Sequence, residues 1–525
     1  MWSSKEAIAG VFLFLAVVVC TVIAIGVRAI FRNFASRPAP SPNLGDDAPH
    51  VTIIRPVKGV EPRLYDCIAA SFRQNYPRDK ISIRLCLEND TDPAYPILQR
   101  VLEDFPDLDA QILFEVEDLS LNTMPNMGPN PKIRNISRAY REARGDIVWI
   151  VDCNVWMAKG VLGRMVAKLK GHHVGSGNKP YKFVHQLPIV VDLIDYSAPV
   201  AADGQPLLAA SSVEDDDLDL GEGGSHGNPK LWAQGGGRLD EMFMATSHAK
   251  FYSAINTSGL APCAVGKSTM FCKSQLDHAT NPLLNPKIPR GKGLPTGVDY
   301  FSHNICEDHM IGDVLWNAKF DGYKNHGLVW GDIAVQPMSD MSGKAYTARR
   351  SRWLRARKFT VLPATMIEPF TESFVFATYF TFAITTLQIC GIHPTWTARV
   401  IIWLTTITAW MIIDFLGYRH LHSGVTVEAD EDTPRFARGS INRGGVKSRK
   451  FSEFLAAWIV REALALPIWA YAVVFGNTVN WRGRRFRIRR DTTVEALDPE
   501  EEERSRQMPT PELERGSSQN KQRVD

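Results

Sequence analysis

Cysteine is scarce in this 525-residue chain, and its eight cysteines lie far apart in the sequence. They lack the paired spacing of a zinc site or of a small disulfide framework. We therefore expect the cysteines to be reduced and mostly structural, as in a domain that faces the cytosol.

The chain also lacks an excess of charge of either sign. Sixty Lys and Arg residues against 57 Asp and Glu residues leave a formal net charge of +3, which favours neither a nucleic-acid binder nor a strongly acidic partner. No internal repeat is evident, and the length exceeds that of one soluble module with a simple core. We expect a soluble domain joined to membrane segments.

Charged residues are absent from a long apolar run at residues 7–27. This run is long enough, as a helix, to cross about 30 Å of hydrocarbon. A cleaved signal peptide is the alternative, but no clean small-residue cleavage site follows, so we interpret residues 1–30 as a retained transmembrane anchor. Three arginines follow the run within ten residues, whereas a single lysine precedes it. This asymmetry predicts that the next domain faces the cytosol.

Three further apolar runs form a C-terminal membrane region over residues 370–480. They are residues 374–390, 398–416 and 456–476. The first two predict a membrane hairpin. The third contains Arg461 and Glu462, so an in-plane or re-entrant helix competes with a full span. Basic residues on both sides of this third run conflict with a single crossing, and its topology stays open.

Residues 50–360 have the pattern of a soluble α/β domain. The β-rich runs VTIIRPV, ISIRLCL, AQILFEV and DIVWIVD are separated by helical sequence, which predicts a mostly parallel sheet with ligands at the carboxyl ends of its strands. Residues 192–228, acidic and rich in Gly, Ala and Ser, predict a disordered surface insertion. The charged residues 495–525 predict a disordered tail.

Carboxylates follow two of these predicted strands. Asp92 comes after ISIRLCL, where it would hold a nucleotide's base or ribose, although this segment taken alone favours a turn that ends the strand. Asp152 and Asn154 come directly after DIVWIV, where hard oxygen ligands suit a divalent cation that bridges a diphosphate. A turn or a helix cap is the alternative for this second segment.

Two later segments carry further candidate groups. Glu307 and Asp308 begin an apparent helix, either as a general base that activates a hydroxyl or as an acidic first turn that suits the helix dipole. Arg349, Arg352 and Trp353 lie in ARRSRWLRARK. Guanidinium groups suit a diphosphate and an indole offers a stacking surface, whereas a juxtamembrane helix on anionic lipid would use the same residues.

The ordered set of DPA, DCN, ED and RRSRW resembles the D, D, D, (Q/R)xxRW signature of processive and lipid-directed inverting glycosyltransferases with a GT-A fold. The stretches IIRPVKGVEP, NPKIRNI, ATSHAKFY and LPATMIEPFTESF make the resemblance strongest to the ceramide glucosyltransferases. It covers roughly residues 10–490, without the acidic insertion and the tail.

The resemblance implies a GT-A-type nucleotide-sugar-binding domain that transfers glucose from UDP-glucose to the primary hydroxyl of ceramide with inversion. It implies a multi-pass protein of the Golgi or endoplasmic reticulum membrane, with the catalytic domain in the cytosol. A processive polysaccharide synthase is the main alternative, but it needs a channel, and two or three late apolar segments make a pore in one chain difficult. A dolichol-phosphate sugar transferase and a catalytically silent membrane adaptor are further alternatives.

The resemblance also implies roles for single residues. Asp308 would be the catalytic base, with Glu307 beside it in the active site, Asp92 would contact the nucleotide, and Asp152 would serve a divalent cation, Mg²⁺ or Mn²⁺, and the diphosphate. Asn154 stands where a full DxD pair has its second carboxylate, and this departure weakens the metal expectation.

The remaining implied residues lie around the leaving group. Arg349, Arg352 and Trp353 match the leaving-group and acceptor motif. Lys132 would contact the diphosphate, unless it is a surface lysine, and His248 matches a histidine linked to the active site, unless it is only packed in the structure.

Overall fold

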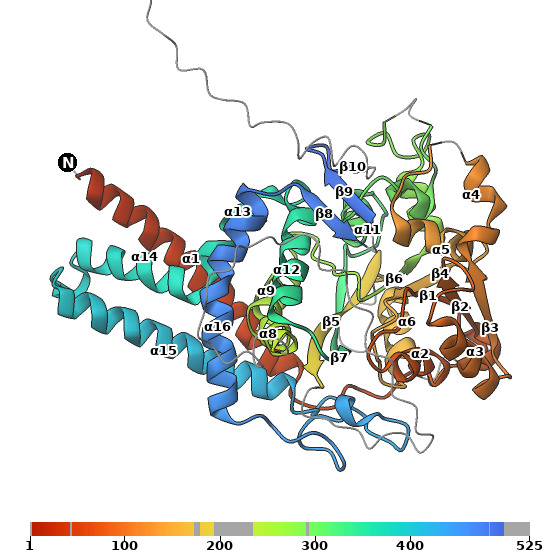
Figure 1. Ribbon diagram of the computed structural model, residues 1–525, viewed down its shortest axis with the longest axis horizontal. Coiled ribbons are helices and arrows are strands. Elements are labelled where there is room, and N and C mark those ends of the chain that lie inside the picture. Colours follow the sequence, from red (N-terminus) through yellow and green to blue (C-terminus); the bar gives the residue numbers. More distant parts are fainter. Residues whose placement is uncertain are drawn as a thin grey trace, which may run out of the picture.

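A seven-stranded sheet lies at the centre of the α/β domain (Figure 1). The computed structural model describes residues 3–42, 45–124, 126–172, 179–193, 235–289, 293–481 and 484–497. In order across the sheet, the strands are β3 (Asp109–Phe114), β2 (Ile81–Leu87), β1 (Val51–Pro56), β4 (Ile147–Val151), β6 (Ser268–Cys272), β5 (Phe183–Asp192) and β7 (Gly327–Met338). Only β6 runs antiparallel to its neighbours, so the predicted mostly parallel sheet is confirmed.

Both faces of the sheet are covered by helices, which is why the central strand β4 is apolar throughout. In β4, Trp149 and Val151 face one core, while Val148 and Ile150 face the other. On the first face lie α2 (Leu64–Phe72), α3 (Tyr95–Asp104) and α6 (Val161–Lys170). On the second lie α5 (Pro131–Arg141), α10 (Lys273–Thr280) and α11 (Glu307–Asn317). The short helix α4 (Leu119–Thr123) follows β3.

A helical segment connects the sheet to the N-terminal membrane helix. It consists of α8 (Gly236–Phe243), a π-helical turn (Met244–His248) and α9 (Ala249–Ser258). The segment packs against α1 (Ser4–Asn33) so closely that a Cβ on Gly26 would overlap the carbonyl oxygen of Lys250. Glycine at this crossing therefore lets the anchor and the domain touch backbone to backbone.

Among the described residues, three helices are long and apolar enough to span a membrane: α1, α15 (Trp396–Leu421) and α16 (Phe451–Trp469) with its π-helical extension to Val474. The helix α14 (Ser373–Thr386), which pairs with α15 as a hairpin, has only 14 residues. Figure 1 shows α1, α14 and α15 extending side by side away from the domain, whereas α16 runs across them next to the domain. The third late apolar run is long and apolar enough to span, so the choice between an in-plane helix and a full span stays open.

Helix α12 (Gly343–Arg357) packs against both α8 and α16, and α13 (Leu362–Ile367) follows it, with the Thr365 carbonyl accepting from the Trp469 indole at 2.7 Å. The hydroxyl of Ser342 caps α12 by accepting from the Ala345 N–H at 3.0 Å. Packing of Tyr346 and Leu354 of α12 against Ile468 of α16 buries an apolar seam. The arginine motif is therefore held between the domain and the crosswise helix.

A second sheet follows the membrane helices, and the sequence analysis did not predict it. It consists of β8 (Thr478–Trp481), β9 (Arg484–Ile488) and β10 (Val494–Ala496), all antiparallel. Phe486 and Ile488 are buried between arginines that alternate with them, which is the period of a half-buried strand. Strand β10 includes the first two residues of the expected tail, and β5 includes Asp192 of the expected insertion. The rest of both segments, residues 194–228 and 498–525, lies outside the described residues.

Candidate active site

The register of two neighbouring strands places a lysine beside Asp152. Strand β6 is antiparallel to β4 and pairs Ser268 with Val151, so Lys267 and Asp152 lie next to each other at the carboxyl end of β4. The Asp152 N–H donates to the Lys267 carbonyl at 3.2 Å. The Lys267 Nζ lies 3.0 Å from Asp152 Oδ2 and 3.4 Å from Asn154 Oδ1.

A second lysine approaches Asp152 from the start of α5. The Nζ of Lys132 lies 3.1 Å from Asp152 Oδ1 and 3.0 Å from Glu307 Oε1. Asn130 caps α5 by accepting from the N–H groups of Lys132 and Ile133, and its amide donates to Glu307 Oε2 at 3.4 Å. The structure thus joins Lys132, Asp152 and Glu307, which lie far apart in the sequence, into one cluster.

The charges of this cluster stabilise one another. Burial works to raise the pKa of Asp152, but the ammonium groups of Lys132 and Lys267 outweigh it and hold this pKa below its ordinary value. Burial also opposes the charge on Lys132, yet Asp152 and Glu307 raise its pKa above the ordinary value. For Glu307, burial raises the pKa despite the opposing effect of Lys132. Asp152 and Lys132 are therefore ionised at neutral pH.

Asp308 lies at the edge of this cluster, half-buried in the first turn of α11. Its Oδ2 accepts a hydrogen bond from the Gly266 N–H. A Cβ at position 266 would lie 2.8 Å from the same oxygen, so glycine is needed for this approach. The carboxylate is thereby oriented next to the residue that precedes Lys267.

Asp92 has a different environment from the one its expected role suggests. Its two carboxylate oxygens accept from the Gly59 N–H at 3.0 and 3.1 Å, and Oδ1 also accepts from the Ala94 N–H at 2.9 Å. These bonds join the loop after β1 to the start of α3. A direct contact between Asp92 and a nucleotide stays a prediction, and the observed bonds give the side chain a role in shaping the loop.

The arginine motif lies on α12. Arg349 pairs with the buried Asp240 at 3.1 Å, donates to Gln336 at 3.3 Å and lies 4.4 Å from the centroid of the Trp353 ring. Trp353 packs near Phe243. Arg352 lies on the same helix. The contacts of Arg349 and Trp353 described above are with residues other than Asp152 and Asp308. The expected roles of Arg349, Arg352 and Trp353 at the leaving group and the acceptor therefore stay predictions.

His248 lies in the π-helical turn, where its ring stacks on Tyr252 at 5.1 Å. Burial, together with Arg350 and Arg357, lowers its pKa to about 3. The imidazole is therefore neutral at physiological pH and contributes aromatic packing rather than charge. This environment agrees with the alternative of a packed structural histidine.

The residues at Asp152 do not fit the expected divalent cation. Each Asp152 oxygen faces an ammonium group, the Asn154 oxygen faces Lys267, and Glu307 faces Lys132. A cation needs several free oxygen ligands at 2.0–2.6 Å. Within the described ranges, no group of three or more His, Cys, Asp or Glu side chains is arranged to hold a metal ion.

Sequence reasoning missed Lys267 and Asn130. Lys267 lies 115 residues from Asp152, and only the antiparallel register brings it there. Its signal in the sequence is the segment Gly266, Lys267 and Ser268 directly before an apolar strand. Asn130 begins the stretch NPKIRNI, in which an Asn-Pro pair before a helix is a recognisable cap signal.

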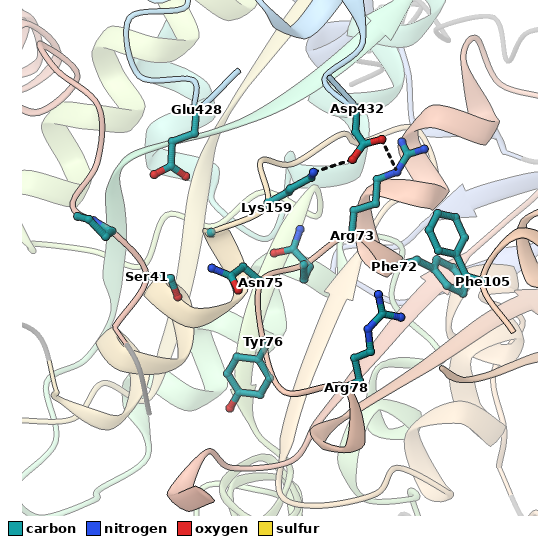
Figure 2. Close-up of a pocket in the computed structure, with 13 residues that line it drawn as sticks. Ser41, Phe72, Arg73, Asn75, Tyr76, Arg78, Phe105, Lys159, Glu428 and Asp432 are labelled. Carbon is teal, nitrogen blue, oxygen red and sulfur yellow. Dashed lines mark hydrogen bonds and ion pairs between the residues drawn. The ribbon is translucent and has the colours of Figure 1, made fainter. Parts of the chain in front are cut away.

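The large cavity drawn in Figure 2 lies near the amino end of β2. It has a volume of about 660 Å³, and its wall includes Arg73, Arg78 and Phe105 around the segment that precedes β2. The loop after α15 closes it, where Lys159 pairs with Asp432 at 2.6 Å. Since Asp92 and Asp152 follow their strands, this cavity is separate from the carboxylate cluster.

Comparison with known proteins identifies the family. The model of glycosyl transferase family 21 matches residues 11–192 and 233–494. A ceramide glucosyltransferase of Gibberella zeae is 67% identical over an alignment of 534 positions that covers 100% of both chains. One of Pyricularia oryzae is 48% identical over 91% of this chain and 93% of its own, and one of Candida albicans is 35% identical over 85% and 88%.

Solved structures are more distant. A mannosyltransferase from Pyrobaculum calidifontis in complex with GDP-Man and Mn²⁺ is 16% identical, covers 78% of this chain and 98% of its own, and has a TM-score of 0.40. The family match covers most of the chain, including the sheet, the carboxylate cluster and the membrane helices. This protein therefore belongs to glycosyl transferase family 21.

Proposed function

We propose that this glycosyltransferase transfers glucose from UDP-glucose to the primary hydroxyl of ceramide with inversion, giving β-glucosylceramide and UDP. The observation that carries the proposal is the cluster of Lys132, Asp152 and Glu307 with Asp308 at its edge. The names of the fungal relatives support the sugar and the acceptor.

Asp308 is the proposed general base. In a single displacement, the ceramide hydroxyl oxygen bonds to C1 of glucose while the bond from C1 to the diphosphate oxygen breaks on the opposite face. The hydroxyl proton passes to the carboxylate. The bond from Gly266 fixes Oδ2 of Asp308, which leaves Oδ1 to accept the proton.

The donor is proposed to lie at the carboxyl ends of β1, β2 and β4. Asp92 orders the loop that contains Gly59. The backbone of this loop and Lys132 lie at the carboxyl ends of the strands, where α/β sheets hold nucleotides. Arg349, Arg352 and Trp353 are proposed to act on the leaving group and the acceptor from α12. In this proposal Arg349 does so by fixing the Trp353 ring.

The acceptor is proposed to approach from the membrane along the seam between α12 and α16. This seam is lined by Tyr346, Leu354 and Ile468, with Arg350 at its polar end. Tyr346, Leu354 and Ile468 are buried in the structure, so this approach requires α12 and α16 to move apart. The path opened in this way would have both an apolar and a polar part, which matches a lipid with apolar chains and a hydroxyl-bearing head. The crosswise direction of α16 keeps the seam next to the three helices that extend away from the domain (Figure 1). We propose a Golgi or endoplasmic reticulum membrane, with the domain in the cytosol.

The product of the reaction tests this function. Membranes that contain the protein are incubated with radiolabelled UDP-glucose and ceramide, and lipids are extracted into organic solvent. Labelled glucosylceramide is the expected product. An insoluble labelled polymer would instead indicate a polysaccharide synthase, a labelled polyprenyl lipid a dolichol-type transferase, and no product a silent adaptor.

A matched pair of variants on α11 tests the base. Asp308→Asn should lower kcat by about 100- to 10,000-fold, the range for loss of a positioned base, while UDP binding is retained. Asp313→Asn changes an exposed carboxylate on the same helix and should leave kcat close to that of the unchanged protein. Full turnover by the Asp308 variant would remove the base assignment.

A further inference from the structure

We infer that Lys132 and Lys267 together supply the positive charge that the departing diphosphate requires, in place of a divalent cation at Asp152. The inference rests on the proposed function and concerns the same site. It reverses the expectation that Asp152 holds Mg²⁺ or Mn²⁺.

The first support is that both carboxylate oxygens of Asp152 already face an ammonium group. Asp152 Oδ1 lies 3.1 Å from Lys132 Nζ, and Asp152 Oδ2 lies 3.0 Å from Lys267 Nζ. A divalent cation bound to either oxygen would lie next to one or both ammonium groups, and like charges at such distances repel strongly. The two lysines thus compete with a metal ion for Asp152.

The second support is the nature of the neighbouring donors. Asn154, which replaces the second carboxylate of a DxD pair, is neutral, and its oxygen lies 3.4 Å from Lys267 Nζ. Glu307 is held by Lys132 at 3.0 Å. The carboxylates of Asp152 and Glu307 are therefore each paired with an ammonium group, whereas a metal site of hard oxygen ligands leaves its oxygens free for the cation.

The third support is that both lysines are held in place before substrate arrives. Lys132 and Lys267 are 9% and 7% exposed. The Asn130 cap fixes the backbone of Lys132, and the pairing of β6 with β4 fixes that of Lys267. Preorganised positive groups stabilise a developing negative charge without reorganising during the reaction, and lysine is a common partner of phosphate.

The chemistry at this site is a charge redistribution. As the bond between C1 of glucose and the diphosphate oxygen breaks, its electron pair stays on that oxygen, and the ammonium groups of Lys132 and Lys267 stabilise it. The hydroxyl proton goes to Asp308, as in the proposed mechanism. No oxidant, reductant or further reactant is involved.

Two measurements on the purified full-length chain in lipid nanodiscs test the inference. Glucosyl transfer is assayed with excess EDTA and across a Mn²⁺ and Mg²⁺ titration, and UDP binding is measured by calorimetry under the same conditions. The unchanged protein should keep at least half of its turnover and its UDP affinity in EDTA. Loss of both in EDTA, with recovery on adding either cation, would overturn the inference.

The variant Lys267→Met removes one ammonium group while keeping a long side chain. In EDTA it should lose at least 10-fold in kcat and in UDP affinity, and Mn²⁺ should recover part of both, because Asp152 and Asn154 are then free to bind it. Lys273→Met, at the other end of β6, should behave like the unchanged protein. A Lys267→Met variant that equals Lys273→Met in EDTA would contradict the role of Lys267.

Two further outcomes, a variant that does not fold and a protein that yields no product, are interpreted as follows. Should Lys267→Met fail to fold, Lys267→Arg keeps the charge and should retain turnover in EDTA, and its loss there would count against the inference. If no condition yields glucosylceramide, the proposed function fails. UDP binding that is strong in EDTA would then still support the lysine pair, and UDP binding that requires Mn²⁺ would refute it.

Discussion

The side-chain amide of Asn304 donates hydrogen bonds to the carbonyl oxygen of Thr492 at 3.0 Å and to its Oγ1 at 3.1 Å. Thr492 has a φ of 70°, a left-handed conformation that is rare for a β-branched residue. The Asn304 carbonyl in turn accepts from Asn130, the residue that reaches Glu307. The sheet that follows the membrane helices is thereby joined to the start of α11.

We expect Asn304→Ala to lower kcat by about 10- to 100-fold, because small displacements of reacting groups have effects of this size. The KM for UDP-glucose should change less, because the ion pair between Lys132 and Asp152 remains. Steady-state kinetics and thermal unfolding measure both effects. Thr493→Ala is the control, because it removes a neighbouring, partly buried hydroxyl that donates to Asp491 at 2.6 Å and has no bond to Asn304. An Asn304 variant with lowered stability but unchanged kcat would limit the contact to a structural role.

Glu307→Gln should be milder than Asp308→Asn. Glu307 is buried against Lys132 and Asn130, so it orients the lysine rather than meeting the acceptor. We expect a loss in kcat/KM of about 10-fold, in the range for one charged hydrogen bond, against at least 100-fold for Asp308→Asn. Parallel kinetics of the two variants measure this ratio. A reversed order would transfer the role of base to Glu307.

A buried histidine makes the stability of the domain depend on pH. His326 stacks on Trp316 with a centroid distance of 4.9 Å, and burial followed by the charge of Lys168 lowers its pKa to about 4. The ordinary pKa of histidine is 6.5, so the unfolded chain binds the extra proton first, and stability falls as pH drops through this window. The cost is about 3 kcal/mol between pH 6.5 and 4.

His326→Phe should remove this part of the pH dependence. Both ring nitrogens of His326 are buried without hydrogen-bond partners among the described residues, so a phenyl ring keeps the stacking and loses no bond. Thermal unfolding of the variant should vary less between pH 6.5 and 4 than that of the unchanged protein. Parallel curves for the two proteins would exclude His326 as a source of acid lability.

The ion pair between Arg461 and Glu372 should contribute strongly to the free energy of unfolding. Arg461 is 1% exposed, and its guanidinium lies 2.7 Å from Glu372 and 2.5 Å from Glu462. Arg461→Met should lower the free energy of unfolding by about 3–5 kcal/mol, because it leaves buried carboxylates unpaired. Denaturant unfolding in detergent measures this loss. The double change with Glu372→Gln should recover part of it, and a single variant as stable as the unchanged protein would contradict the prediction.

The sequence by itself determined the local elements and several site candidates. Strand β4 could be predicted because five apolar residues precede Asp152, and α11 could be predicted because Glu307 and Asp308 open an amphipathic helix. Periodicity and end signals are local, so they are readable from neighbouring residues. The family resemblance, which the comparisons confirm, also rested on short motifs in chain order.

Only the tertiary structure decided how these pieces meet. It brought Lys267 to Asp152 through an antiparallel strand pair, and it set α16 across the other membrane helices with an ion pair between Arg461 and Glu372. It also folded Arg484, Arg485 and Arg487 into β9. The first two contacts join residues that are far apart in the chain, and the second also turns a charge inward against a partner. Such pairings depend on strand register and on the burial of charge, and both arise only when the whole chain has packed.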